Sequence, residues 1–421
     1  MPVTGKTLIR AEEVIARCRR LATFSEDAQG TRRTFLSAPM RECHREIGAW
    51  LKAAGAEVWI DAAGNLRAFY PAVNAGAPRL LIGSHLDTVP NAGAYDGVLG
   101  VVLGVALLEA LDGRRLPFGI EVTGFSEEEG VRFGVPFIGS RALVGGLDDE
   151  LLNRRDSKGM SVRQAIEGFG LNPNEVPKAR LQDDAIAFLE FHIEQGPVLE
   201  ARGHRLGVVE SIAGQTRMAL VFKGSANHAG TTPMELRHDA VAGAAEWIVA
   251  VERQAQGTAE LVATVGTIGA KPGAANVIAG EAQLTLDIRH KSDEIRENAV
   301  AALTREAEEI ASRRGLSVQC SVLLQQKAVV MDPFLMSQIE TAIRKSGCEP
   351  YRMTSGAGHD AMILAERVPA GMIFLRSPGG ISHEPAESVL VEDVAKAIEC
   401  GLQLLEQLAG SAEFQKRTCR A

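Results

Sequence analysis

Residues 83–97, with the sequence GSHLDTVPNAGAYDG, lie between two apolar runs and contain three side chains that can bind a metal ion. Residues 80–82 before them predict a buried strand, and residues 98–108 after them predict a buried helix. In open α/β sheets, ligands bind at the carboxyl ends of the strands, where this loop lies. Imidazole and carboxylate groups are typical ligands of zinc-like divalent ions. The three candidates are His85, Asp87 and Asp96.

Two interpretations of this stretch stay open at this point. In the first, strand alternation puts His85 and Asp87 on one face, so that Asp87 could hold and orient the His85 ring beside a metal. In the second, His85 ends a strand and the two aspartates form Asx turns. The remainder of the chain has to distinguish them.

The composition excludes several classes of protein. The chain has 421 residues, 46% hydrophobic and 23% charged, as expected for a soluble protein of two or three domains. A net charge of −8, with no basic cluster, argues against a nucleic-acid partner. The first 24 residues contain no apolar signal segment, and the longest apolar run is too short to span a membrane. Six scattered cysteines without a C-x-x-C pair indicate free thiols and a cytoplasmic location: Cys18, Cys43, Cys320, Cys348, Cys400 and Cys419.

The order of predicted elements indicates an α/β catalytic domain interrupted by a second domain. Strand, helix and strand alternate through residues 80–125, as in a sheet covered by helices. Residues 147–182 predict a surface excursion with short helices. From residue 214 the order becomes β-α-β-β-α-β, that of a ferredoxin-like α+β sandwich. We therefore predict a discontinuous domain of residues 1–213 and 331–421, with residues 214–330 inserted.

Three further segments place candidate ligands after predicted strands. The strand at residues 119–125 is followed by Glu127, Glu128 and Glu129, which are either a solvated turn or a ligand with a general base. The strand at residues 186–194 carries His192, although a lone histidine on a strand is more often structural. A loop framed by glycine and proline presents His383. Five ligands are enough for a two-metal site in which one carboxylate bridges.

These motifs together resemble the M20 metallopeptidase superfamily, and within it the hydantoinase/carbamoylase branch. The resemblance runs from residue 83 to 387 and rests on motifs in the family's order. They are GSHLDTVPNAGAYDG, FSEEEGVRFG, FHIEQGPVLE, HAGTTPMELRHDA, NVI, LDIRH, SGAGHDA and SHEPAE. His192 favours this branch, because many M20 peptidases have Asp at that position.

The resemblance implies a role for each motif residue. Asp96 would bridge two divalent ions, which could be zinc, manganese, cobalt or nickel. His85 and His192 would complete one ion's site, Glu129 and His383 the other's, and Glu128 would be the general base. The inserted domain would act as a lid and form a homodimer, whose substrate residues could reach the neighbouring chain. The implied substrate-binding residues are Gln195, His228, Asn276, Arg289, Gly358 and His359.

The chemistry of a ureido substrate fits these residue types. Its carbonyl is a poor electrophile, and a divalent ion lowers the pKa of water from 15.7 towards about 7, so that water becomes a nucleophile at neutral pH. Glu128 would accept the proton and pass it to the leaving nitrogen. A second ion or His228 would stabilise the oxyanion, a contribution of about 3–4 kcal/mol. Arg289 can hold a carboxylate by two hydrogen bonds, although on residue pattern alone a surface cation at a strand end explains it as well.

Three functions remain to be compared. The first is a metal-dependent amidohydrolase that cleaves the ureido bond of N-carbamoyl-L-amino acids or allantoate, releasing ammonia and carbon dioxide. The second is an M20 aminoacylase or peptidase acting on N-acyl amino acids or small peptides. The third is a binding protein on the same scaffold, which the presence of all five ligands and the base disfavours.

Overall fold

The computed structural model describes residues 5–416, and their contacts divide the chain into two compact units. The first unit ends at Glu210 and resumes at Met331, and the second unit is Ser211–Val330. Within the described part, no helix is long and apolar enough to cross a membrane. The five cysteines that it contains are unpaired thiols, and Cys419 lies outside the described residues.

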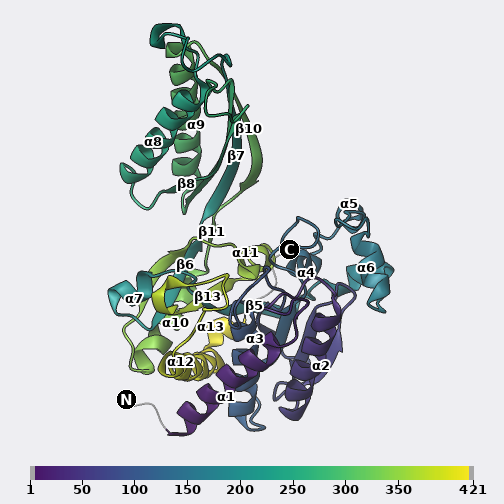
Figure 1. Ribbon diagram of the computed structural model, residues 1–421. Helices are drawn as coiled ribbons and strands as arrows, with labels where there is room; N and C mark the ends of the chain where they lie inside the picture. Colours follow the sequence, from purple (N-terminus) through teal and green to yellow (C-terminus); the bar gives the residue numbers. More distant parts are fainter. Residues whose placement is uncertain (1–4, 417–421) are drawn as a thin grey trace. The chain divides into compact units, whose positions relative to one another are not determined.

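A nine-stranded mixed sheet forms the centre of the first unit, although its edge strand Val329–Val330 and the last two residues of the strand Leu206–Ile212 fall in the residue range of the second unit (Figure 1). Its central strands β4, β3, β5 and β13 are parallel, whereas the flanking pairs are antiparallel. In spatial order the strands are β1 (Glu57–Ile60), β2 (Leu66–Tyr70), β4 (Gly119–Phe125), β3 (Arg79–His85), β5 (Ala185–Ile193), β13 (Ala370–Leu375), β6 (Leu206–Ile212) and β11 (Val329–Val330), with β12 (Tyr351–Ser355) paired to β6. The α/β class predicted from the sequence is confirmed.

Helix α3 (Val98–Leu111) packs directly onto the parallel strands. It is buried along nearly its whole length, as expected for a helix that is apolar on every side. Gly100 permits the close approach, because a Cβ atom there would lie 2.1 Å from the carbonyl oxygen of Phe191 on β5. The start of α3, and with it the loop that precedes the helix, is therefore fixed against the sheet.

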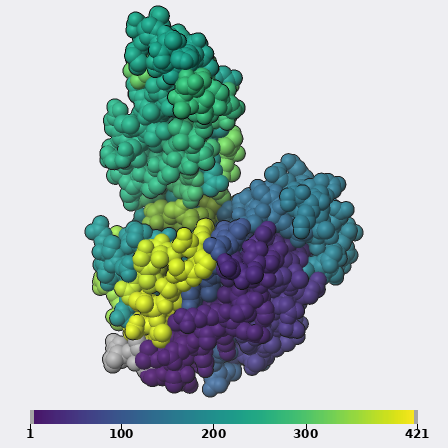
Figure 2. All heavy atoms as spheres, in the orientation of Figure 1, coloured from purple at the N-terminus to yellow at the C-terminus, as the bar shows by residue number. Residues whose placement is uncertain are grey.

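Four longer helices, α1, α2, α10 and α12, complete the cover of the sheet. N-terminal α1 and C-terminal α12 pack side by side, so segments far apart in the sequence are neighbours here (Figure 2). The excursion after β4 contains short helices, as the sequence of residues 147–182 predicted, and they pack in a small apolar core that also includes Phe35, Leu36 and Ala63. The helices of this unit are α1 (Gly5–Ala22), α2 (Ala38–Ala53), α4 (Ile138–Val144), α5 (Asp149–Leu152), α6 (Val162–Gly168), η1 (Pro173–Ala179), α7 (Val198–Arg202), α10 (Pro333–Lys345), α11 (Asp360–Leu364), η3 (Pro378–Gly380), α12 (Val391–Ala409) and α13 (Ala412–Gln415).

The second unit is an antiparallel sheet with two long helices on one face. Its four strands lie in the spatial order β10, β7, β9, β8. Trp247 and Leu303, one from each helix, pack with Leu220 and Leu284 of the sheet in one apolar core. The elements in chain order are β7 (Gly214–Lys223), η2 (Met234–Leu236), α8 (Ala240–Gln256), β8 (Val262–Lys271), β9 (Glu281–His290), α9 (Asp293–Arg313) and β10 (Ser317–Gln326).

The structure differs from the sequence-based expectation in two places that bear on the site. His85 is the last residue of β3 and not part of the following loop, so its ring is held by the sheet. Strands β6 and β12 were not predicted. Strand β6 nevertheless forms the antiparallel neighbour of β13 and thereby extends the sheet beyond the parallel strands.

Candidate metal centre

The candidate ligands meet at one edge of the central sheet because they follow parallel strands. His85 ends β3, His192 lies next to the end of β5, and Glu129 comes four residues after β4. His383 follows β13, while Asp96 comes just before α3. Parallel strands bring their carboxyl ends to the same edge, which explains why residues almost 300 positions apart become neighbours.

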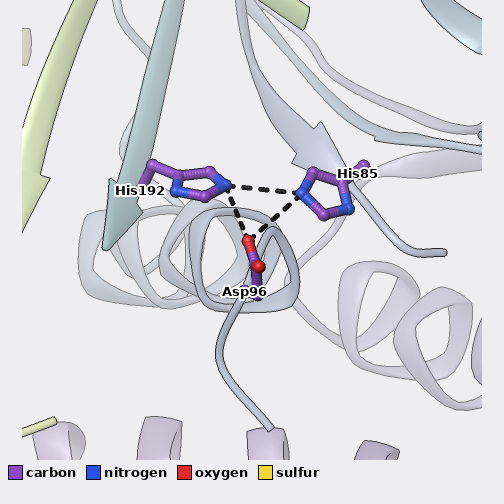
Figure 3. A group of neighbouring side chains, drawn as sticks. All are labelled: His85, Asp96 and His192. Atoms are coloured by element: carbon purple, nitrogen blue, oxygen red, sulfur yellow. Dashed lines mark hydrogen bonds and ion pairs between the residues drawn. The ribbon is translucent and has the colours of Figure 1, made fainter. Parts of the chain in front are cut away.

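Asp96 lies at the centre of this group and faces it with both carboxylate oxygens. Its Oδ1 lies 3.5 Å from His85 Nε2 and 3.2 Å from His192 Nε2 (Figure 3). Its Oδ2 lies 3.2 Å from His383 Nε2, and that nitrogen lies 3.7 Å from Glu129 Oε1. The two oxygens therefore serve two different sets of neighbours, one buried and one next to the half-exposed His383.

The donor set fits divalent cations. The two histidine Nε2 atoms are 3.4 Å apart, and two ligand atoms bound at 2.0–2.1 Å to a tetrahedral zinc ion lie about 3.3–3.4 Å apart. Asp96 Oδ1 is buried and has no hydrogen-bond partner among the described residues. A buried carboxylate oxygen without a partner is costly, and a cation held between it and the imidazoles removes that cost.

Hydrogen bonds to backbone carbonyls orient both buried histidines. His85 Nδ1 lies 3.0 Å from the carbonyl oxygen of Asp87, and His192 Nδ1 lies 2.9 Å from that of Ile193. A carbonyl can only accept, so each Nδ1 carries the proton and donates it. In the neutral ring each Nε2 then has a lone pair directed at Asp96, the form in which histidine binds a metal.

The side chain of Asp87 acts differently from the sequence-based expectation. We expected its carboxylate to hold the His85 ring, but that contact is long, at 3.6 Å, and the Asp87 carbonyl makes the shorter one. The carboxylate instead accepts the backbone N–H groups of Glu128 at 2.9 Å and Glu129 at 3.1 Å. Asp87 thus fixes the candidate base and its neighbour relative to β3.

The acidic segment after β4 is buried and not a solvated turn. Burial, and next the Glu129 carboxylate, raise the pKa of Glu128 well above its usual value. Burial, and then Asp96, raise the pKa of Glu129 to about 7. Carboxyl groups held together in this way repel one another, and cations between them relieve the repulsion.

Gln195 and His383 lie against Asp96 in an unusual backbone conformation. Gln195 Nε2 donates to Asp96 Oδ2 at 2.9 Å and lies 3.3 Å from His383 Nε2. Gln195 has φ 59° and His383 has φ 60°, in the left-handed region that costs non-glycine residues energy. Both side chains are therefore held in place by their surroundings.

His359 is buried behind His192. The two ring centroids are 4.5 Å apart, and His359 Nε2 lies 2.8 Å from Ser355 Oγ. Burial lowers the pKa of His359 well below its ordinary value, so the ring is neutral. Gly358 has no room for a side chain, because a Cβ atom would lie 2.9 Å from the Phe137 ring. A substrate-binding role for this pair stays a prediction.

The candidates on the second unit fall into two groups at opposite ends of its sheet. His228 forms a β-bridge with Val277, next to Asn276, beyond the end where Lys223 pairs with Glu281. Arg289 pairs with Gln215 at the other end of the sheet. At about 3.3 Å per residue, the strand between Glu281 and Arg289 spans about 26 Å. Arg289 is bound there to Asp287, with Nε 2.7 Å from Oδ1 and Nη2 3.0 Å from Oδ2.

Several buried polar residues at the site were not singled out from the sequence. Glu190 on β5 accepts Ser84 Oγ at 2.8 Å and the N–H of Ala361 at 2.9 Å. Glu387 accepts backbone N–H groups of the loop that carries Asp96. An acidic residue in the middle of the apolar strand β5, and a second one in the motif SHEPAE, were the available signals.

Comparisons with known proteins agree with this geometry. A family model described as peptidase family M20/M25/M40 matches residues 81–407. An allantoate deiminase of Arabidopsis thaliana is 39% identical over 435 residues, covering 95% of this chain and 82% of the relative. An N-carbamoyl-L-amino acid amidohydrolase of Geobacillus stearothermophilus is 38% identical over 407 residues, covering 96% and 99%. An amidase of the hydantoinase/carbamoylase family from Burkholderia multivorans superposes with TM-score 0.89 at 30% identity, covering 94% of this chain and 97% of that one.

Proposed function

This chain belongs to peptidase family M20/M25/M40, on the hydantoinase/carbamoylase branch, and we propose that it hydrolyses the ureido carbon–nitrogen bond of N-carbamoyl-L-amino acids or allantoate. The products are the free amine or amino acid, ammonia and carbon dioxide. The main support for this proposal is the position of Asp96, whose two oxygens face two separate groups of metal-ligand side chains beside the buried Glu128. The names of the relatives favour ureido substrates over the N-acyl amino acids and peptides of the alternative.

We assign two divalent ions to the site. His85, His192 and Asp96 Oδ1 would hold the buried one, and His383, Glu129 and Asp96 Oδ2 the one nearer the surface. All five side chains occur in the clusters of metal-competent side chains among the described residues. When bound, such ions supply the Lewis acidity that activates water and polarises a carbonyl. The ligand types admit zinc, manganese, cobalt and nickel.

Glu128 is our candidate for the general base. Its backbone is fixed by Asp87, and its side chain lies with His85 and Glu129 in one cluster of metal-competent groups. Its carboxylate would take a proton from the attacking water and deliver it to the leaving nitrogen, because the nitrogen leaves readily only when it is protonated. The raised pKa of Glu128 suits this task, because a carboxylate that holds its proton more firmly is a stronger base.

Arg289 is our candidate for recognition of the substrate carboxylate, and His228 for the oxyanion. The guanidinium is bound to Asp287 through Nε and Nη2, which fixes its plane. Asp287 in turn contacts Arg217, whose Nε lies 2.9 Å away. The negative charge of Asp287 partly compensates that of Arg289. Substrate binding therefore does not include the full cost of desolvating an isolated cation.

The length of the second unit's sheet supports a substrate site shared between two chains. A small ureido acid spans less than about 10 Å, or roughly three residues of extended chain. Arg289 and the His228–Asn276 end lie farther apart than that within one chain, so one chain cannot bring both to the same substrate. We propose a homodimer formed through the second unit. Its edge strand β8 exposes Val262 at 60% and Ile268 at 54%, an apolar surface suited to pairing with a second copy.

The test is an ammonia-release assay on protein reconstituted with each metal. The substrates are allantoate, N-carbamoyl-L-amino acids and β-ureidopropionate, with product detection on N-acetyl amino acids as the comparison. We expect turnover on at least one ureido acid and much weaker turnover on N-acetyl compounds. Preferential cleavage of N-acetyl amino acids would favour the aminoacylase alternative, and no turnover by metal-loaded protein would contradict both.

A further inference from the structure

Glu387 is a buried carboxylate whose position ties together the two loops at the candidate centre. It lies four residues after His383 and is only 5% exposed. Its Oε1 accepts the backbone N–H of Tyr95 at 2.8 Å and that of Asp96 at 3.0 Å. One oxygen of the His383 loop therefore holds the main chain of the central carboxylate residue, 291 positions away in sequence.

A second connection runs through Ser382. Its Oγ lies 3.4 Å from Glu387 Oε2 and 3.3 Å from Asp96 Oδ2. The serine hydroxyl thus stands between the two carboxylates. The Asp96 backbone and the Asp96 side chain are both positioned from the segment that carries His383.

Gly93 makes the approach of Glu387 possible. A Cβ atom at position 93 would lie 2.5 Å from Glu387 Cβ and 2.8 Å from Glu387 Oε1, closer than real atoms allow. The peptide that precedes Asp96 is therefore shaped around this carboxylate. The close contact between Gly93 and Glu387 can therefore be weakened by a substitution at either residue.

The two halves of the centre depend on this contact to different degrees. His85 and His192 lie on strands β3 and β5, and carbonyl contacts hold their rings. His383 lies on a loop and its side chain is 49% exposed, so its distance to Asp96 Oδ2 depends on the contacts that join the two loops, those of Glu387 and Ser382 together with that of Gln195. Loss of these contacts should disturb the half of the centre nearer the surface and spare the buried half.

We propose that Glu387 is a positioning residue that keeps Asp96 in register with His383, and so makes one carboxylate able to bridge two cations. The inference rests on the proposed two-ion centre. It assigns to Glu387 the role of a hydrogen-bond acceptor and not that of a metal ligand. Its carboxylate is already engaged by backbone N–H groups and by a hydroxyl.

The experiment compares Glu387→Ala and Glu387→Gln with wild type, using Mn²⁺ as the probe. Metal titration and elemental analysis give the number and affinity of bound ions, and electron paramagnetic resonance distinguishes an exchange-coupled Mn²⁺ pair from an isolated ion. We expect Glu387→Ala to bind one ion normally and the second about 10–100-fold more weakly, with loss of the coupled signal. Glu387→Gln keeps an acceptor oxygen and should retain the pair. Glu384→Ala, in the same loop but exposed, is the matched control.

A second variant keeps the test decisive if Glu387→Ala does not fold. Gly93→Ala leaves Glu387 chemically intact and displaces it, and it should weaken the same single ion. Both ions bound with unchanged affinity and coupling in either folded variant would overturn the inference, as would equal weakening of both ions. Absence of an ion pair in wild type would instead contradict the proposed two-ion centre.

Discussion

Mixing two inactive variants tests the separation of substrate residues within one chain. His228→Ala and Arg289→Ala remove groups at opposite ends of the second unit's sheet, which lie about 26 Å apart at 3.3 Å per residue. If one small substrate needs both groups, it takes them from different chains. In a mixed dimer, one site then contains both residues intact and the other site contains neither.

The expected recovery follows from simple statistics. Random exchange of equal amounts makes about half of the dimers mixed, each with one working site of two, so about a quarter of wild-type activity should return. The assay is ammonia release after exchange, with native mass spectrometry to measure the mixed dimer. His228→Ala mixed with Asn276→Ala is the matched control, because these residues lie at the same end of the sheet and no site regains both. A first mixture that stays inactive despite proven exchange would refute the shared site.

Four other outcomes are expected. Asp96→Ala should lose both ions together, and elemental analysis that finds one tightly held ion would contradict bridging by Asp96. Glu128→Gln should keep its metal content while kcat falls by about 10²–10⁴-fold; near-normal turnover would assign the base elsewhere. A mixture of Glu128→Gln and His228→Ala chains should recover activity after subunit exchange, because His228 is proposed to act on the partner's site. An inactive mixture after proven exchange would place His228 in the site of its own chain. In the presence of a chelator, burial and the Asp96 charge raise the pKa of Glu129 to about 7, so the stability that its proton contributes is complete below the unfolded pKa of about 4.3 and is lost as pH rises through 7. Across that range, Tm measured in chelator should fall, and the increase in Tm on adding metal should grow. A Tm that does not change with pH would contradict the raised pKa.

The sequence was most informative where local pattern and strand topology act together. Apolar residues 80–82 and 98–108 predicted β3 and α3, because burial on all sides leaves a continuous apolar run. Once the strands are parallel, residues after their ends are neighbours, which is why His85, Glu129 and His192 could be grouped without coordinates. Strand β6 was missed because Leu206–Ile212 includes Glu210 and begins only four residues after a short helix ends at Arg202.

The contacts that refine the site could not be found in this way. Asp87 binds the backbone of Glu128 and Glu129, and Glu387 binds the backbone of Asp96. Backbone N–H groups are present at every residue except proline, so no sequence pattern marks which of them a carboxylate accepts. The separation of His228 from Arg289 was equally hidden, because it depends on strand register and not on residue type.

The interruption of the first unit by the second has a consequence for how the protein is made. His85, Asp96 and His192 leave the ribosome early, whereas His383 follows roughly 190 residues later, a delay of about 10–40 s at 5–20 residues per second. During that time β5 has no β13 to pair with, since β13 also lies beyond the interruption. The nascent chain therefore exposes a buried-type strand edge, and it has the side chains for one cation position before those for the other. Chaperone capture and early metal loading are both expected to act in this interval.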